Sequence, residues 1–350
     1  MDGITASAPA ILLVGNFLSG SGGHKAVCEE LAEQLQASAW PVIRTSAQRS
    51  KAARLIDMLF TCWSRRHEYD RAQVDVFSGS AFVWAELSCW LLRRLGRPYV
   101  LTLHGGSLPQ FAERWPGRVR RLLHSAAAVT TPSRYLYEKM SGYRDGLLIV
   151  PNAIDLTRYH SRLRERPAPH LMWLRSFHAI YNPSLAIEVL ALTSEHYPEA
   201  RLTMVGPDKG DGSLQAAQSL ARRLGVENRV EFNGGIPKER VPEWLQKGDI
   251  FLNTTDTDNT PVSVLEAMAC GLCVVSTNVG GIPFLLHDGE DALLVERRDA
   301  ATAAQAVRRI IDNPSLAAKL SGNGRRLAEQ FDWSVVIPCW FKLLQSVGQG

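Results

Sequence analysis

The sequence has little that would mark a secreted or membrane-spanning chain. Its six cysteines are scattered through 350 residues without the regular spacing of a disulfide framework. No uninterrupted apolar run is long enough to span a bilayer, and the apolar stretch 10–14 near the start is too short for the core of a secretion signal. We therefore expect a cytoplasmic protein, which would reach the inner face of a membrane only as a peripheral protein.

A strong excess of either charge is also missing. The formal net charge is +4, from 39 basic and 35 acidic residues. The excess is uneven: residues 1–150 hold 18 Lys and Arg against 12 Asp and Glu, whereas residues 151–350 hold 21 against 23. No recognisable nucleic-acid module accompanies the basic half. This balance excludes nucleic acid as the expected partner and favours an anionic lipid or membrane surface beside the first half.

Metal and redox signatures are sparse as well. Cys270 and Cys273 form a lone CxxC with no second pair of ligands nearby. A metal or redox role stays open for this pair. Because a short apolar strand follows it, we favour two buried small side chains.

What the sequence does have is a regular alternation of short apolar strands and amphipathic helices. Such alternation predicts parallel sheets covered on both faces, with ligands at the carboxyl ends of the strands. We expect two doubly wound Rossmann-like α/β domains, at 1–151 and 170–331, joined by a polar linker at 152–169 and followed by a helical segment at 332–350. Strands are predicted at 10–14, 41–44, 74–77, 99–103, 127–131, 147–150, 171–174, 201–205, 229–232, 250–253, 273–276 and 292–295.

The segment 257–271 carries the strongest functional signal. A strand ends, a polar loop turns, and a helix begins near Val262 with Pro261 at its first turn. Backbone N–H groups at such a helix start suit a diphosphate. Glu266, one turn further on, can accept hydrogen bonds from two ribose hydroxyls, while Asp258 lies in the loop. The alternative is an ordinary helix in which Glu266 only complements the helix dipole.

This segment resembles the donor-site motif of glycosyltransferase family 4, in which two acids separated by seven residues precede Ala-Met-Ala-x-Gly. Glu266 matches the second acid, and Asp258 stands where the first is normally Glu. The resemblance continues at 151–155, 276–283 and 289–295 and reaches across nearly all of the second half. It implies a GT-B fold with two domains facing across a cleft, an N-terminal acceptor domain, a C-terminal donor domain, and a final helix that returns to the N-terminal domain.

The resemblance also implies an activity. It is retaining, metal-independent transfer of a sugar from a nucleoside-diphosphate donor, UDP first, to a hydroxyl acceptor in polysaccharide or glycolipid assembly. No cofactor is expected, and the nucleotide-sugar is a substrate. Two alternatives stay open. One is an epimerase of the same fold, and the other is a non-catalytic binding subunit, suggested by the departures at Asp258 and Asn182 from the family pattern.

Further site residues follow from the resemblance. Arg175, at a strand end, would hold the diphosphate, since its planar fork matches phosphate oxygens. The family usually has a Lys seven residues later, where this chain has Asn182. Lys209 is a candidate substitute, or else a solvated loop lysine. Asp258 and Asn259 would orient the sugar. The other donor-site residues would lie in the same loop and at the helix start, and they are Thr260, Pro261, Val262 and Ser263.

The glycine-rich loop after the first strand is neither a P-loop nor a dinucleotide fingerprint. The second strand ends in Arg44-Thr45, without the acid that would hold an adenosine ribose, so an NAD site is excluded. Gly22 and Gly23 resemble instead the family's Gly-Gly loop, which closes over the donor. His104 follows a strand end, where the family's His commonly contacts the transferred sugar. A buried structural histidine is the alternative.

Asp256-Thr257-Asp258 spells the metal signature DxD of the other main glycosyltransferase fold. We interpret the match as a coincidence, and expect no metal site. On the acceptor side, residues 49–66 mix basic and large apolar groups. They predict contact with an anionic membrane that carries a lipid-linked acceptor, or else core-facing helices with solvated basic faces. The same mixture extends to Trp84, Trp90, Arg93, Arg94, Arg118, Arg120 and Arg121.

Overall fold

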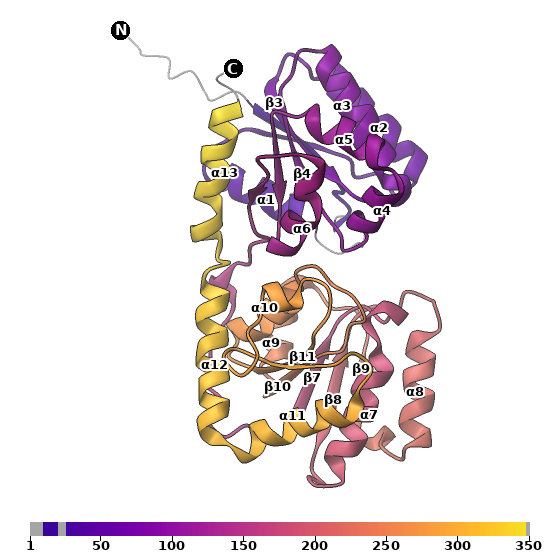
Figure 1. Cartoon of the computed structure of the whole chain (residues 1–350), viewed down its shortest axis with the longest axis vertical. Coiled ribbons are helices and arrows are strands. Elements are labelled where there is room, and N and C mark those ends of the chain that lie inside the picture. Colours follow the sequence, from indigo (N-terminus) through magenta and orange to yellow (C-terminus); the bar gives the residue numbers. More distant parts are fainter. Residues whose placement is uncertain (1–9, 20–25, 348–350) are drawn as a thin grey trace. The chain divides into compact units, whose positions relative to one another are not determined.

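The computed structural model describes residues 10–19 and 26–347. The chain divides into two compact units, residues 1–153 with 333–350, and residues 154–332. Each unit is built on a six-stranded parallel sheet covered by helices on both faces (Figure 1). The predicted α/β class with two Rossmann-like domains is confirmed.

The sheet of the N-terminal unit has the strand order β2-β1-β3-β4-β5-β6. All six strands lie at predicted positions, although β3 begins five residues earlier than expected. Their bounds are β1 Ala10–Val14, β2 Val42–Thr45, β3 Tyr69–Val76, β4 Tyr99–Leu103, β5 Ala128–Thr131 and β6 Leu148–Ile149. The helices are α1 Val27–Ala37, α2 Lys51–Ser64, α3 Phe82–Arg94, α4 Leu108–Arg114, α5 Pro116–His124, α6 Arg134–Met140 and α13 Trp333–Val347.

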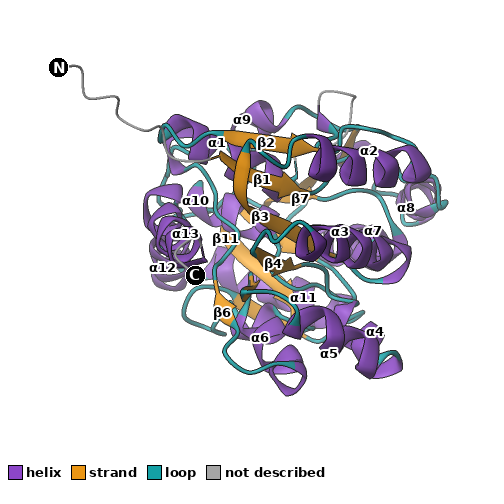
Figure 2. Cartoon of the chain, turned by 90° about the horizontal axis from the view of Figure 1, so that it is seen from above, coloured by secondary structure: helices purple, strands orange, loops and turns teal. Residues whose placement is uncertain are grey.

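The two faces of this sheet are set by the alternation of side chains along each strand. Leu12 and Val14 of β1 face a core formed with α2 to α6, whereas Ile11 and Leu13 face a second core formed with α1 and α13. Helices α2, α3 and α5 lie side by side over the first face (Figures 1 and 2). A sheet buried on both sides explains why its strands are apolar runs.

The C-terminal helix α13 is part of the N-terminal unit. Its buried side chains, among them Trp333, Val336, Trp340 and Leu344, recur at helical spacing and pack with those of α1. Phe341 stacks on Trp40 with ring centroids 5.6 Å apart. The guanidinium of Arg71, from β3, donates to the carbonyl of Leu344. These contacts attach the end of the chain to the unit in which it began.

The second unit has the strand order β12-β11-β10-β7-β8-β9. One face is covered by α7, α8 and α11, and α9 and α10 cover the other. The strands are β7 His170–Leu174, β8 Arg201–Val205, β9 Val230–Asn233, β10 Ile250–Asn253, β11 Cys273–Thr277 and β12 Leu293–Val295. The helices are α7 Pro183–Ser194, α8 Ser213–Arg223, α9 Val241–Leu245, α10 Val262–Ala269, α11 Ala300–Asp312 and α12 Pro314–Glu329.

The segment predicted as a polar linker, 152–169, differs from that expectation, because from Ile154 onward it is packed into the second unit. Arg164 is only 2% exposed. Its guanidinium donates to the carbonyls of Gly248 and Cys270 at 3.0 and 2.5 Å, and to the carboxylate of Asp249 at 3.2 Å. A buried arginine needs such partners to offset its desolvation.

Candidate functional site

The two strands at the centre of the second sheet mark the point where its connections reverse direction. From β7 the chain proceeds through β8 to β9 on one side, and β10 to β12 then build the other side. Ligands of doubly wound sheets bind outside the carboxyl ends of the strands at this reversal. Arg175 directly follows β7, and Asp258 lies in the loop that follows β10. Both predicted site residues therefore lie at the reversal.

Arg175 and Asp258 form an ion pair with each other. The guanidinium of Arg175 also lies over the ring of Tyr181, with its carbon 4.6 Å from the ring centroid. Burial lowers the pKa of Arg175, and Tyr181 and Glu266 oppose that shift. Among the described residues the buried Nε of Arg175 has no hydrogen-bond partner. An anionic ligand would supply the missing acceptor.

Glu266 is 3% exposed and belongs to α10. Its Oε1 accepts a hydrogen bond from the hydroxyl of Tyr159 at 2.8 Å and lies 2.8 Å from the Nζ of Lys238. A buried carboxylate with these two donors is held in one orientation. Glu266 therefore has two side-chain partners in addition to its place near the start of α10.

Sequence reasoning missed Lys238 and Tyr159. Lys238 follows β9 by five residues, so the rule that ligands gather at carboxyl ends of strands would have brought it into consideration. Tyr159 lies in the segment interpreted as a linker and meets Glu266 across 107 positions of sequence. No local pattern points to that contact.

The start of α10 is arranged as predicted, with Pro261 as its N-cap residue and Val262 as its first residue. Asn259, Thr260 and Pro261 are buried in the preceding loop. Ser263, in the first turn, has a buried hydroxyl without a hydrogen-bond partner among the described residues. The first backbone N–H groups of a helix also lack intrahelical partners, so this helix start offers donors to an anion.

Two glycines hold the Asp258 loop from the other side. The N–H of Gly281 donates to the carbonyl of Asp258 at 2.9 Å. A Cβ on Gly281 would lie 1.9 Å from the carbonyl oxygen of Asn259, and one on Gly280 2.2 Å from that of Asp258. Only glycine permits this close approach of the two backbones. The turn at 276–283, which carried part of the family resemblance, thus sets the position of the loop.

Lys209 and Asn182 have different surroundings. The backbone N–H of Lys209 donates to the carbonyl of Phe177 at 3.1 Å, which attaches its loop to the segment after Arg175. The Lys209 side chain itself is exposed. Asn182 adopts a left-handed conformation with φ of 45°, and its Oδ1 accepts from the N–H of Leu185 at 3.3 Å at the start of α7. Asparagine tolerates this conformation and caps helices well, so it has a structural role here.

The two carboxylates of the DxD sequence are directed to different arginines. Asp256 pairs with Arg298, whose Nη2 lies 2.5 Å from its Oδ2, and Asp258 pairs with Arg175. Within residues 10–19 and 26–347, no cluster of three His, Cys, Asp or Glu side chains could hold a metal ion. Cys270 and Cys273 are buried, and burial raises the pKa of both thiols to about 12. Such thiols are unreactive near neutral pH.

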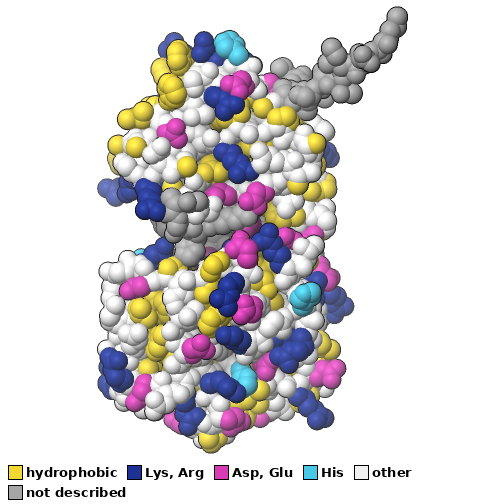
Figure 3. All heavy atoms as spheres, turned by 180° about the vertical axis from the view of Figure 1, so that it is seen from behind, with side chains coloured by type: hydrophobic (Ala, Val, Ile, Leu, Met, Phe, Trp, Pro, Cys, Tyr) yellow, Lys and Arg dark blue, Asp and Glu magenta, His cyan; other side chains and the backbone are white. Residues whose placement is uncertain are grey.

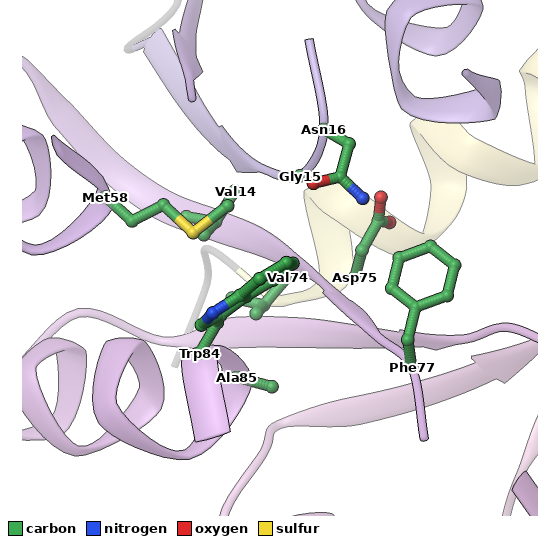
Figure 4. Close-up of a pocket in the computed structure, with 9 residues that line it drawn as sticks. All are labelled: Val14, Gly15, Asn16, Met58, Val74, Asp75, Phe77, Trp84 and Ala85. Atoms are coloured by element: carbon green, nitrogen blue, oxygen red, sulfur yellow. The ribbon is translucent and has the colours of Figure 1, made fainter. Parts of the chain in front are cut away.

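The N-terminal unit has its own reversal point, between β1 and β3. A small cavity at this point is lined by Gly15, Asn16, Asp75 and Trp84, together with Val14, Met58, Val74, Phe77 and Ala85. The carboxylate of Asp75 points toward the Asn16 side chain (Figure 4). A Cβ on Gly15 would lie 2.6 Å from Oδ2 of Asp75 and 2.8 Å from Sγ of Cys28, so any larger residue would displace these side chains.

His104 is 8% exposed, just after β4. Its Nε2 lies 2.9 Å from Oδ1 of Asp75, and Phe77 stacks on its ring with centroids 4.9 Å apart. Asp75 also accepts from the Nε2 of Gln73 at 2.8 Å. His104 is thus buried and held by a carboxylate that sequence reasoning missed. Gly22 and Gly23, predicted to lie over the donor, fall outside the described residues.

In sequence comparisons, each of the two units matches a family of glycosyltransferases. The family described as "Glycosyltransferase Family 4" matches residues 21–158, and the one described as "Glycosyl transferases group 1" matches residues 168–327. A D-inositol 3-phosphate glycosyltransferase from Streptomyces avermitilis is 29% identical over 43% of this chain and 34% of its own length. The match thus spans about a third of that relative's length.

Two further similarities cover more of the chain. A GDP-mannose-dependent alpha-(1-6)-phosphatidylinositol monomannoside mannosyltransferase from Mycolicibacterium smegmatis is 28% identical over 61% of each chain. Sucrose-phosphate synthase from Thermosynechococcus elongatus has a similar structure, with a TM-score of 0.78 over 97% of this chain and 99% of its own, at 20% identity. Anabaena HepE, solved with UDP, has a TM-score of 0.76 over 96% and 100%, at 19% identity.

Proposed function

The chain belongs to glycosyltransferase family 4, and we propose that it transfers a sugar from a nucleoside-diphosphate donor to a hydroxyl acceptor. The observation that carries the proposal is the cluster at the reversal of the second sheet, where Arg175, Glu266 and the start of α10 meet. It combines a buried cation, a carboxylate held by two donors, and the unpaired hydroxyl of Ser263 in the first turn of α10. A nucleoside diphosphate presents the complementary groups, a diphosphate and two vicinal hydroxyls.

Each group has a distinct task in this proposal. Glu266 accepts hydrogen bonds from the ribose hydroxyls, for which Tyr159 and Lys238 keep it in place. Arg175, Ser263 and the N–H groups at the start of α10 hold the diphosphate. Negative charge grows on the diphosphate as the bond to the sugar breaks. Hydrogen-bond donors that are already in position stabilise this transition state more than the bound substrate, and so lower the barrier.

The remaining roles concern the sugar. The transferred sugar is attached to the diphosphate beyond Arg175, so Asp258 and Asn259 orient its hydroxyls. When the diphosphate arrives, it competes with Asp258 for Arg175. Contact of His104 with the same sugar is a separate part of the proposal and rests on the family resemblance.

We propose retention of the anomeric configuration and no requirement for a metal. The pairing of both DxD carboxylates with arginines supports the second point, because neither oxygen pair is left for a shared cation. UDP is the first nucleotide to test, as in the HepE complex, and GDP is the second, as in the name of the mannosyltransferase. A cytoplasmic location and an acceptor in glycolipid or polysaccharide assembly complete the proposal.

The test is thermal unfolding with saturating UDP, GDP, ADP or NAD, each with and without EDTA. A ligand at about 100 times its dissociation constant stabilises the folded state by about 2.7 kcal/mol. We expect one of the nucleoside diphosphates to raise the unfolding temperature equally with and without EDTA, and Arg175→Ala to abolish that shift. A shift with NAD alone, or none, contradicts the proposal.

A second measurement separates an enzyme from a binding subunit. Release of the nucleoside diphosphate from its hexose conjugate, followed with a coupled assay, must exceed the rate given by Arg175→Ala. Nucleotide binding without any release above that rate would identify the chain as a non-catalytic partner.

A further inference from the structure

Two neighbouring helices of the N-terminal unit expose large apolar side chains at the same spacing. On α2, Ile56, Phe60 and Trp63 are 67%, 62% and 53% exposed. On α3, which packs against α2, the corresponding side chains are Val83, Leu87 and Trp90. Positions i, i+4 and i+7 lie along one side of a helix, so each set forms a stripe in solvent. An exposed apolar surface of this kind marks an interaction site.

Each exposed tryptophan on this side of the unit has an arginine over its ring. The guanidinium carbon of Arg66 lies 4.8 Å from the Trp63 ring centroid, and that of Arg94 lies 5.6 Å from the Trp90 centroid. Trp115, exposed between α4 and α5, has Arg114 at 5.7 Å. Helix α5 is joined to α3 by an ion pair between Arg118 and Glu86. We call this surface the Trp–Arg face.

The charge of the Trp–Arg face is strongly positive. Apart from the buried Arg54, the segments 49–66, 82–97 and 114–124 contain eleven lysines and arginines against two acids, Asp57 and Glu86. Figure 3 shows apolar and basic side chains interspersed on the rim of the N-terminal unit, on the side where Figure 1 places α2 and α3. Trp84 does not belong to this face, because it lines the cavity beside Asp75 with Arg54 over its ring.

We propose that the Trp–Arg face docks on an anionic lipid bilayer. Apolar stripes alone would suit many partners, but the positive charge selects a negative one. Tryptophan and arginine both have an apolar body and a polar group, so they suit the boundary between headgroups and acyl chains. The stripes run along the sides of α2 and α3, so these helices lie flat on the surface. No helix in the described part of the chain is long and apolar enough to cross a bilayer.

This inference deepens the proposed function, because a lipid-linked acceptor would be reached from the bilayer surface, and that part rests on the proposed function. Binding to the bilayer can be measured without any nucleotide. The test is therefore flotation of the full chain with vesicles of phosphatidylcholine alone or with about 30% phosphatidylglycerol, in about 0.1 M and about 0.5 M salt. We expect binding to the anionic vesicles only, weakened by salt. UDP binding is measured on the same samples, so a failed donor site and a failed membrane site give different results.

Two variants separate the contribution of the positive charge to vesicle binding from that of the apolar side chains. Arg93→Glu/Arg94→Glu should weaken vesicle binding about 25-fold or more, since each arginine near an anionic surface contributes about fivefold. Phe60→Ser/Trp63→Ser should lower binding even in low salt. The matched control is Arg222→Glu/Arg223→Glu, which changes the same charge on exposed positions of α8 in the second unit and should bind like the unchanged chain.

Unfolding temperature and UDP affinity, measured on every variant, show that each one is folded. Three results would overturn the inference. They are equal binding to neutral and anionic vesicles, equal loss in the α8 control, and concentration-dependent self-association that Phe60→Ser/Trp63→Ser removes while vesicle binding is unchanged. The last result would identify a second copy of the chain as the occupant.

Discussion

The Nε2 of His104 lies 2.9 Å from Oδ1 of Asp75, and the two side chains come from adjacent strand ends of one sheet. Because an ionised carboxylate only accepts hydrogen bonds, this contact places the ring proton of His104 on Nε2. If His104 contacts the sugar as proposed, Asp75 acts through it as a positioning residue.

Asp75→Ala should lower turnover about tenfold or more, because His104 loses its partner in a buried site. UDP affinity should stay the same, because the proposed nucleotide site lies in the other unit. The kcat and the dissociation constant for UDP are measured for Asp75→Ala, His104→Ala and the double variant. The double variant should be no slower than His104→Ala, and fully additive losses would contradict the coupling. Asp70→Ala, in the same strand but half-buried and paired with the buried Arg71 instead of His104, is the control.

Glu266→Gln should weaken UDP binding about 10-fold to 100-fold, because a hydrogen bond to a charged group contributes about 1.5–3 kcal/mol. Isothermal titration with UDP measures the change. The matched variant is Glu243→Gln, an exposed acid on α9 paired with Arg240, which should bind UDP normally. Equal affinities for the two variants would exclude the ribose role of Glu266.

Gly281→Ala should destabilise the protein by about 1–3 kcal/mol, because its new methyl group overlaps the carbonyl of Asn259. The displaced loop carries Asp258, so UDP binding should weaken in parallel. Denaturant unfolding and titration test both effects. Gly234→Ala, whose Cβ meets nothing within 4 Å, provides the comparison and should leave stability nearly unchanged. A stable Gly281→Ala protein would refute the steric argument.

Lys209→Ala should weaken UDP binding less than Arg175→Lys does. The Lys209 side chain is exposed, so solvent screens its attraction to a phosphate, whereas Arg175 is largely buried and its planar fork is not reproduced by lysine. Titration of both variants with UDP shows which substitution causes the larger loss of affinity. A larger loss for Lys209→Ala would make it the principal phosphate ligand.

The native protein should contain one rapidly reacting thiol, that of Cys339, because the other five cysteines are buried. Burial raises the pKa of Cys62, Cys270 and Cys273 to about 12, so their thiolates are absent at pH 8 and still scarce at pH 9.5. Titration with a thiol reagent at both pH values should give the same count, and Cys339→Ser should remove it. A second fast thiol at pH 8 would revive a redox role for the CxxC pair.

The strands could be predicted because each is a short apolar run between polar turns, which a sheet buried on both faces requires. The four strands β1, β4, β8 and β10 have the expected bounds. Helix α4 has no comparable sequence signal, because its seven residues include Pro109 and show no extended apolar period. Residues 154–169 were misinterpreted as a linker, because the partners that bury Arg164 lie more than 80 positions away.

The sequence by itself determined three features: the alternation of strands and helices, the loops that follow the carboxyl ends of the strands, and the motif from Asp258 to Glu266. Those features are local, since they depend on periodicity and on turn residues. Only the tertiary structure decided that Tyr159 holds Glu266 across 107 positions and that Asp75 holds His104 across 29. Such pairs depend on which strands lie side by side and which segments pack over them, and burial of the whole unit fixes that order.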